Sequence, residues 1–171
     1  MTEVEQGAPS DADVAFMRRA IEWGRRGERK PGGSPIGCVI VLDGRVIGEG
    51  HNENELRGVP IAHGELVAIE RACHAIGKPE LRGATLYSTL QPCGMCTLAC
   101  VWAKVGRIVY GARRGEVHEA YFDERHISTE DLIRDAYRTD LNVHGGVLAA
   151  ECAALYIGPD EELPKEEMFN L

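Results

Sequence analysis

Apolar residues follow two different spacings over the first fifty positions. Helical spacing over 10–26, opened by a Ser-x-x-Asp pair that resembles a capping box, predicts a first helix. Two apolar runs rich in β-branched residues, 36–42 and 45–50, predict strands. The Asp43-Gly44 pair between them is typical of a tight hairpin turn, so we expect the two strands to be antiparallel neighbours.

The middle of the chain repeats a helix–strand unit. Helical spacing predicts helices over 62–76 and 93–104, and apolar runs predict strands over 84–89 and 107–110. An order of helix, strand, helix and strand favours parallel strands, so the sheet should be mixed. Both predicted helices would then begin at one edge of the sheet, where ligand sites of open α/β sheets are found.

The last third of the chain gives weaker patterns. A helix is predicted from Ser128, a short fifth strand over 141–143, and a buried helix over 147–157. We therefore expect one domain, 1–171, with a core over about 11–157 and tails at both ends. The predicted fold class is α/β, a three-layer α/β/α sandwich around a mixed five-stranded sheet.

Composition limits the setting in which this chain works. Hydrophobic residues make up 44% of the 171 residues, and no run approaches the roughly 20 apolar residues of a membrane helix. The N-terminus lacks the pattern of a secretory signal, and the six cysteines lie mostly in apolar segments, which favours a reducing cytoplasm. The net charge of −8 favours small uncharged substrates over nucleic acid.

The most reactive side chains lie at the start of two predicted helices. Cys93 and Cys96 are three positions apart just after Pro92, so both thiols can bind one metal ion from one face of a first helical turn. His63 is the natural third ligand, and three protein ligands leave one position of a tetrahedral zinc ion to water. Glu65 remains available to carry protons. Without His63 and Glu65, the two thiols would equally predict a redox pair or half of a structural zinc site.

A His-x-Glu triplet followed by Pro-Cys-x-x-Cys resembles the cytidine-deaminase superfamily. The resemblance covers about 16–127 and is strongest for the branch that holds bacterial guanine deaminases, fungal-type cytosine deaminases and tRNA adenosine deaminases. His63-Gly64-Glu65 and the segment 89–93 resemble the cytosine enzymes. The segments 101–104 and 119–127 resemble the guanine enzymes, in which a second loop acid serves as a proton shuttle.

The resemblance implies a role for each site residue and one zinc ion per chain. Asn52 would offer a donor and an acceptor to the base, the Gly64 N–H would be free at a helix start, and Glu124 would stand in the place of the loop acid. The residues alone also allow simpler roles. Asn52 could shape the turn after a strand, Glu124 could be a solvated loop acid, and Trp102 could fill the core. The implied residues are, for the metal, His63, Cys93 and Cys96; for catalysis, Glu65 and Glu124; for substrate binding, Ile36, Asn52, Gly64 and Trp102.

These features predict an enzyme that uses water to remove an amine as ammonia. We expect a cytoplasmic homodimer that deaminates a free nucleobase or a related amino-heterocycle, with guanine, cytosine and amino-triazines as candidate substrates. A tRNA adenosine deaminase or a nucleoside deaminase is the first alternative, and a non-catalytic zinc-binding scaffold is the second. The acidic segment 160–167 argues against RNA. We therefore expect neither a nucleic-acid partner nor a membrane.

Overall fold

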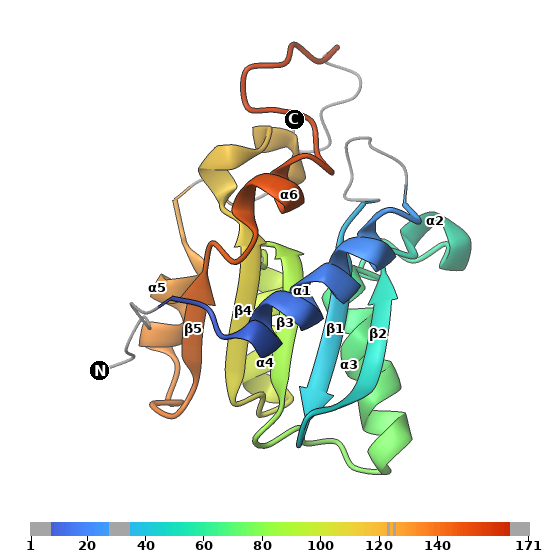
Figure 1. Ribbon diagram of the computed structural model, residues 1–171, viewed down its shortest axis with the longest axis vertical. Coiled ribbons are helices and arrows are strands. Elements are labelled where there is room, and N and C mark those ends of the chain that lie inside the picture. Colours follow the sequence, from blue (N-terminus) through green and yellow to red (C-terminus); the bar gives the residue numbers. More distant parts are fainter. Residues whose placement is uncertain (1–7, 28–34, 123, 125, 165–171) are drawn as a thin grey trace.

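A five-stranded sheet forms the centre of the molecule (Figure 1). The structure is a computed structural model that describes residues 8–27, 35–122, 124 and 126–164. The strands lie in the order β2-β1-β3-β4-β5, with β1 antiparallel to both neighbours and β3, β4 and β5 parallel to one another. Their bounds are β1 Gly37–Leu42, β2 Arg45–His51, β3 Thr85–Leu90, β4 Arg107–Ala112 and β5 Asn142–Gly145.

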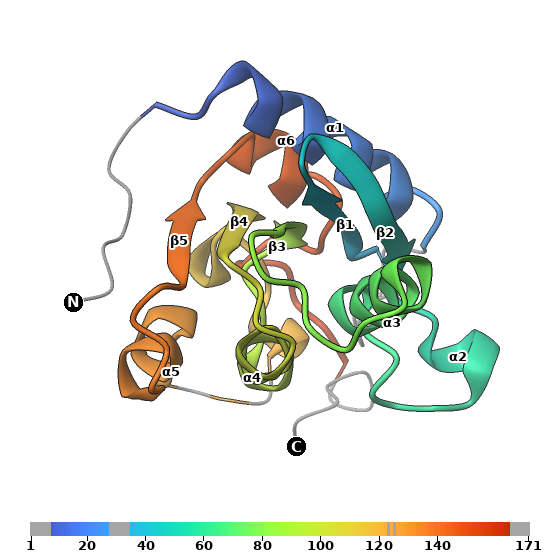
Figure 2. The same ribbon diagram turned by 90° about the horizontal axis from the view of Figure 1, so that it is seen from below.

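Helices cover both faces of this sheet (Figure 2). α1 and α6 lie on one face, and α3, α4 and α5 lie on the other, so the predicted three layers and mixed sheet are confirmed. The segment between β2 and α3 contains a single-turn helix, α2. Among the described residues, no helix is both long and apolar enough to cross a membrane. The helices are α1 Asp11–Gly24, α2 Asn54–Arg57, α3 Gly64–Ile76, α4 Gly94–Trp102, α5 Thr129–Asp135 and α6 Ala149–Ala153, with 3-10 turns η1 Arg114–Glu116 and η2 Glu119–Tyr121.

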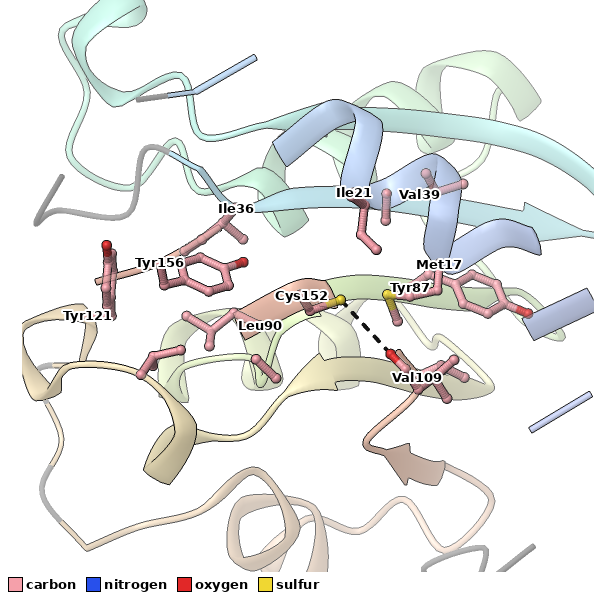
Figure 3. Packing of buried hydrophobic residues seen from close by; sticks show 14 of the residues in the cluster. Met17, Ile21, Ile36, Val39, Tyr87, Leu90, Val109, Tyr121, Cys152 and Tyr156 are labelled. Carbon is pink, nitrogen blue, oxygen red and sulfur yellow. Dashed lines mark hydrogen bonds between the residues drawn. The ribbon is translucent and has the colours of Figure 1, made fainter. Parts of the chain in front are cut away.

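Strand β1 shows why the sheet is covered on both faces. Successive side chains of a strand point to opposite faces. Val39 and Val41 join the core that contains residues of α1 and α6, seen close up in Figure 3. Cys38 and Ile40 join the second core, with residues of α3 and α4. An uninterrupted apolar run is therefore expected here, because neither face of β1 meets solvent.

The hairpin between β1 and β2 has the predicted turn. Asp43 and Gly44 have φ values of 50° and 72°. Both central residues of a type I′ turn need positive φ, which glycine and aspartate tolerate better than most residues. The antiparallel pairing of the two strands follows directly from this turn.

The three strands that lead into the site, β2, β3 and β4, end at the same edge of the sheet. β2 and β3 are both antiparallel to β1, so they run in one direction, and β4 runs parallel to β3. The residues that follow these strands, Asn52, Gln91 and Arg113, therefore emerge on one side of the molecule. The helices α3 and α4 begin shortly after, which brings their N-termini to this edge.

The predicted buried helix over 147–157 is shorter than expected. Only the five residues of α6 are helical. Beyond α6, the Ile157 N–H donates to the Tyr121 hydroxyl at 3.1 Å, and the Tyr156 hydroxyl lies 2.5 Å from Thr89 Oγ1. These bonds to other elements replace helical hydrogen bonds, and an apolar pattern alone cannot reveal them.

A buried ion pair joins α1 to the sheet. Asp13 accepts hydrogen bonds from Arg107 Nη1 at 2.6 Å, from the Tyr87 hydroxyl at 2.9 Å and from its capping partner Ser10. Burial alone would raise the pKa of the Asp13 carboxyl, but the bonds from Arg107, Ser10 and Tyr87 together hold this pKa well below its usual range. Such a carboxyl stabilises the fold above its unfolded-state pKa, near 4, and this stabilisation is lost as the pH falls towards the folded-state pKa.

Replacing Asp13 should therefore destabilise the protein in a pH-dependent way. Asp13→Ala should lower the free energy of unfolding by about 2–4 kcal/mol at pH 7, because Arg107 and Tyr87 lose their partner. Asp11→Ala, an exposed position in the same helical turn, is the matched control and should cost less than about 1 kcal/mol. Urea unfolding measures both. The gap between wild type and Asp13→Ala should shrink below about pH 4, and equal stability at pH 7 would contradict this role.

Candidate active site

The starts of α3 and α4 bring the predicted metal ligands together. His63 is the N-cap residue of α3, Cys93 is the N-cap residue of α4, and Cys96 lies in the first turn of α4. The Sγ atoms of Cys93 and Cys96 lie 3.7 and 3.6 Å from His63 Nδ1. All three ligand atoms lie within 4.8 Å of one another. The spacing in the sequence thus predicted the cluster correctly.

These separations fit a zinc ion. Tetrahedral bonds of about 2.0–2.1 Å to nitrogen and 2.3 Å to sulfur place the nitrogen and sulfur atoms about 3.6 Å apart. The two observed distances agree with this value. One imidazole and two thiols are also ligands that zinc prefers, and a set of three leaves the fourth position open, as in catalytic sites.

The two thiols have opposite environments. A hydrogen bond from Cys96 lowers the pKa of the Cys93 thiol to about 4, whereas burial raises the pKa of the Cys96 thiol well above its usual value. Cys93 therefore supplies a thiolate at neutral pH, and Cys96 releases its proton when a metal binds. Cys100, one turn further along α4, is fully buried in the core, as predicted.

Glu65 lies beside the ligands without belonging to them. Its side chain, in the first turn of α3, is 2% exposed. Ser88 Oγ donates to Glu65 Oε1 at 3.1 Å, and Cys96 Sγ donates to Oε2 at 3.5 Å. Burial raises the pKa of the Glu65 carboxyl, and the charge of Cys93 adds to this rise. A carboxyl with a raised pKa holds a proton more readily than an ordinary one, which suits acid–base catalysis.

Asn52 and Gly64 form a second part of the site. Asn52 Oδ1 accepts a hydrogen bond from the Gly64 N–H at 2.6 Å, so the expectation that this N–H is free for substrate is wrong. Asn52 Nδ2, in contrast, is buried and has no hydrogen-bond partner among the residues that the structure describes. An unpaired buried donor is costly, and it suits the acceptor of a bound substrate.

Ile36 supports this part of the site through its main chain. Its carbonyl oxygen accepts from the Asn52 N–H at 3.2 Å. A Cβ atom at position 64 would lie only 2.7 Å from the same oxygen, which explains the glycine between His63 and Glu65. The Ile36 side chain points into the core with Leu90 and Tyr156 (Figure 3).

Trp102 lies away from the other site residues. It is the last residue of α4, nine positions after Cys93, a distance of about 13 Å along a helix. Its side chain is 78% exposed, and Leu98, one turn earlier, is also exposed. Trp102 therefore does not fill the core in this chain, contrary to one of the two expectations for it, and its role in substrate binding stays a prediction.

Glu124 does lie close to the ligands. Its Oε1 atom accepts a hydrogen bond from the N–H of Gly94, the residue after Cys93, at 2.7 Å. The same oxygen lies 3.1 Å from Arg114 Nη2. The acid that the resemblance singled out is thus an ion-paired residue at the start of α4, not a solvated loop acid.

The pattern of the sequence missed three residues that support the site. Ser88 on β3 bonds Glu65, and Arg114 bonds Glu124. Thr129 Oγ1, at the start of α5, donates to the carbonyl oxygen of Pro92 at 2.8 Å. Each bond joins residues at least ten positions apart, and none of the three lies in a recognisable motif, so local spacing gave no signal for them.

Comparison with known proteins identifies the family. The model of the cytidine and deoxycytidylate deaminase zinc-binding region matches residues 10–112, which include His63, Glu65, Cys93 and Cys96. The chain belongs to this family. It is therefore a zinc-dependent hydrolytic deaminase, with the His, Cys and Cys ligand set typical of the family.

Its relatives differ in substrate. The tRNA-specific adenosine deaminase of Bacillus subtilis (strain 168) is 35% identical over 91% of this chain and 92% of its own length. The guanine deaminase of the same organism is 37% identical over 67% of this chain and 74% of its own length. A structure from a study of A-to-I editing by tRNA:A34 deaminases superimposes with a TM-score of 0.69 at 32% identity, covering 83% of this chain and 99% of that chain, which confirms the fold.

The metal site predicts the zinc content of the purified protein. Purified protein should contain about one zinc ion per chain by elemental analysis. The double variant Cys93→Ala/Cys96→Ala should contain almost none, because only His63 of the three ligands remains. Cys73→Ala, which removes a thiol near the far end of α3, is the matched control and should keep its zinc. Full zinc content in the double variant would refute the assignment.

Proposed function

We propose that this deaminase acts on adenosine in tRNA and converts it to inosine. The observation that carries the proposal is the extent of the likeness to the tRNA-specific adenosine deaminase, which covers 91% of this chain. Such a span reaches well beyond residue 112, where the family model ends. The likeness to guanine deaminase covers a smaller share, 67%.

The net charge of −8 does not argue against an RNA substrate, because most of the negative charge lies in the two end segments of the chain. Residues 1–9 contain two acidic residues, and residues 158–171 contain five acidic residues and one basic residue. Residues 10–157 therefore carry only two of the eight net negative charges. The expectation that the chain has no nucleic-acid partner rested on the total charge and on the acidic segment 160–167, and it loses the support of the total charge.

Arginine side chains near the edge of the sheet that carries the site also favour an RNA substrate. Arg25 and Arg26 are exposed just after α1, and Arg26 lies 3.9 Å from the ring centre of Trp23. The Trp23 ring lies 5.9 Å from that of His51, the last residue of β2. Basic and aromatic side chains beside a base-binding site are suited to phosphates and to stacked bases.

The chemistry follows from the positions of two side chains. Zinc, when bound, lowers the pKa of a water molecule towards about 7. Glu65 would take up the proton that the attacking water gives away, pass it to a ring nitrogen of the base and later deliver a proton to the amine that leaves as ammonia. Asn52 donates through Nδ2 to an acceptor on the base, because Oδ1 is already bonded to Gly64.

Free guanine is the second candidate substrate. Glu124 supports it, because the carboxylate lies at the start of α4, beside the metal ligands. The likeness to guanine deaminase supports it independently. Cytosine and amino-triazine substrates, and a homodimer, remain predictions from the sequence.

The proton-carrying role is tested by Glu65→Gln. Glutamine has nearly the same shape but cannot carry a proton, so kcat should fall by on the order of 10²–10⁴ or more. The zinc content should stay the same. Glu70→Gln, an exposed position on the same helix, is the control and should leave kcat unchanged. Near-normal turnover by Glu65→Gln would remove this residue from the mechanism.

A substrate panel tests the choice between RNA and free base. We expect inosine in a tRNA anticodon stem-loop that contains adenosine, and little ammonia from guanine, cytosine, an amino-triazine or free adenosine. The kcat/KM for the stem-loop should fall as salt is raised, because phosphate contacts release counterions. Glu65→Gln provides the blank. Rapid release of ammonia from guanine with no inosine in RNA would establish the free-base alternative instead.

A further inference from the structure

Arg114 makes contacts that the proposed chemistry does not use. It follows β4 at the site edge and begins η1, and its side chain is 28% exposed. The guanidinium lies 4.2 Å from the centre of the Phe122 ring. Nη1 donates to the main-chain oxygen of Glu124 at 2.8 Å, and Nη2 lies 3.1 Å from Glu124 Oε1. One side chain therefore holds both the backbone and the carboxylate of Glu124.

This carboxylate caps the helix that carries the thiol ligands. Glu124 Oε1 accepts from the Gly94 N–H at 2.7 Å, and Gly94 directly follows Cys93. The first N–H groups of a helix have no partner within the helix, and negative charge is favourable beside them. The position of Glu124 is therefore coupled to that of Cys93.

A second connection reaches the other side of the same ligand. The main-chain N–H of Arg114 donates to Gln91 Oε1 at 3.1 Å, and Gln91 lies two residues before Cys93. Gln91 Nε2 donates to Glu130 Oε2 at 3.2 Å, and the Tyr110 hydroxyl donates to Glu130 Oε1 at 2.9 Å. Arg114 is thus connected to the chain before Cys93 through its main chain and after it through its side chain.

We propose that Arg114 is a positioning residue of this deaminase, and that Glu124 serves as the hydrogen-bond acceptor that fixes the start of α4. Both partners of Glu124 Oε1 are donors, so this oxygen accepts in both interactions. The proposal rests on the deaminase activity of the family and not on the choice of substrate, because every candidate substrate uses the same metal site. The competing explanation is the proton-shuttle role that the resemblance to guanine deaminases implies for Glu124.

Two substitutions at position 124 separate these explanations. Glu124→Gln keeps an acceptor oxygen for the Gly94 N–H but cannot carry a proton, whereas Glu124→Ala loses both properties. A positioning role predicts a loss of about 10- to 100-fold in kcat or zinc affinity for the alanine variant and a clearly smaller loss for glutamine. A shuttle role predicts equal losses in kcat for both variants.

Substitutions at Arg114 test the other member of the Arg114–Glu124 pair. Arg114→Met removes the guanidinium, and Arg114→Lys restores a charge without the two-pronged geometry, so lysine should rescue only part of the loss. Arg113→Met is the matched control, because it removes the same charge from the neighbouring exposed residue, whose ion pair is with Glu116. Arg114→Met combined with Glu124→Ala should be no worse than the more severe single variant, since both break one unit.

Three measurements apply to every variant: kcat and KM, zinc retained against a competing chelator, and hydrogen–deuterium exchange of a peptide that contains Gly94. We expect Arg114→Met and Glu124→Ala to lose zinc faster and to exchange faster at Gly94 than Arg113→Met and Glu124→Gln. Equal losses of kcat in both Glu124 variants, or an Arg114→Met that matches Arg113→Met, would overturn the proposal. Zinc retention and exchange need no substrate, so they decide the proposal even if the substrate assignment fails.

Discussion

The direction of β1 determines where the chemistry of this protein lies. Because β1 is antiparallel to both β2 and β3, and β4 is parallel to β3, the strands β2, β3 and β4 end at one edge of the sheet. Asn52 follows the first of these strands, the Cys93 segment follows the second, and Arg114 follows the third. The helices α3 and α4 begin at the same edge, and the N-terminus of a helix favours thiolate and carboxylate groups beside it. Reversing the β1–β2 hairpin in the sheet would carry Asn52 to the opposite edge, away from Cys93 and Arg114, which follow the parallel strands β3 and β4.

Burial then gives each polar group at this edge a distinct protonation or hydrogen-bonding state. Glu65 is buried with Ser88 as a donor, which favours a carboxyl that can hold a proton. Cys93 has a lowered pKa and Cys96 a raised one, so the pair holds one proton more readily than two until a metal binds. Within the described part of the chain, the Nδ2 donor of Asn52 has no partner. Together these states describe a site that is complete only with a metal and a hydrogen-bonding substrate.

Local spacing was enough to predict the parts of the site that lie within one helical turn or one hairpin. The ligands Cys93 and Cys96, the capping box at Ser10 and the Asp43-Gly44 turn depend on neighbouring residues, and the structure has all of them. Contacts between distant segments were not predictable in this way. The Gly64 N–H is taken by a side chain twelve positions earlier, and the partners of Glu124 lie ten and thirty positions away. Trp102 shows the same limit, because nothing in an apolar helix tells which face meets solvent.

The central claim is that a three-ligand zinc site with an open fourth position lies beside an unligated glutamate. Zinc-edge X-ray absorption spectroscopy of the purified protein measures the ligand set directly. We expect two sulfur atoms at about 2.3 Å, one imidazole nitrogen at about 2.0–2.1 Å and one further light atom from water. A shell with three or four sulfur atoms would mean that Cys100 or another thiol closes the site. That result would contradict a catalytic zinc and support a structural one.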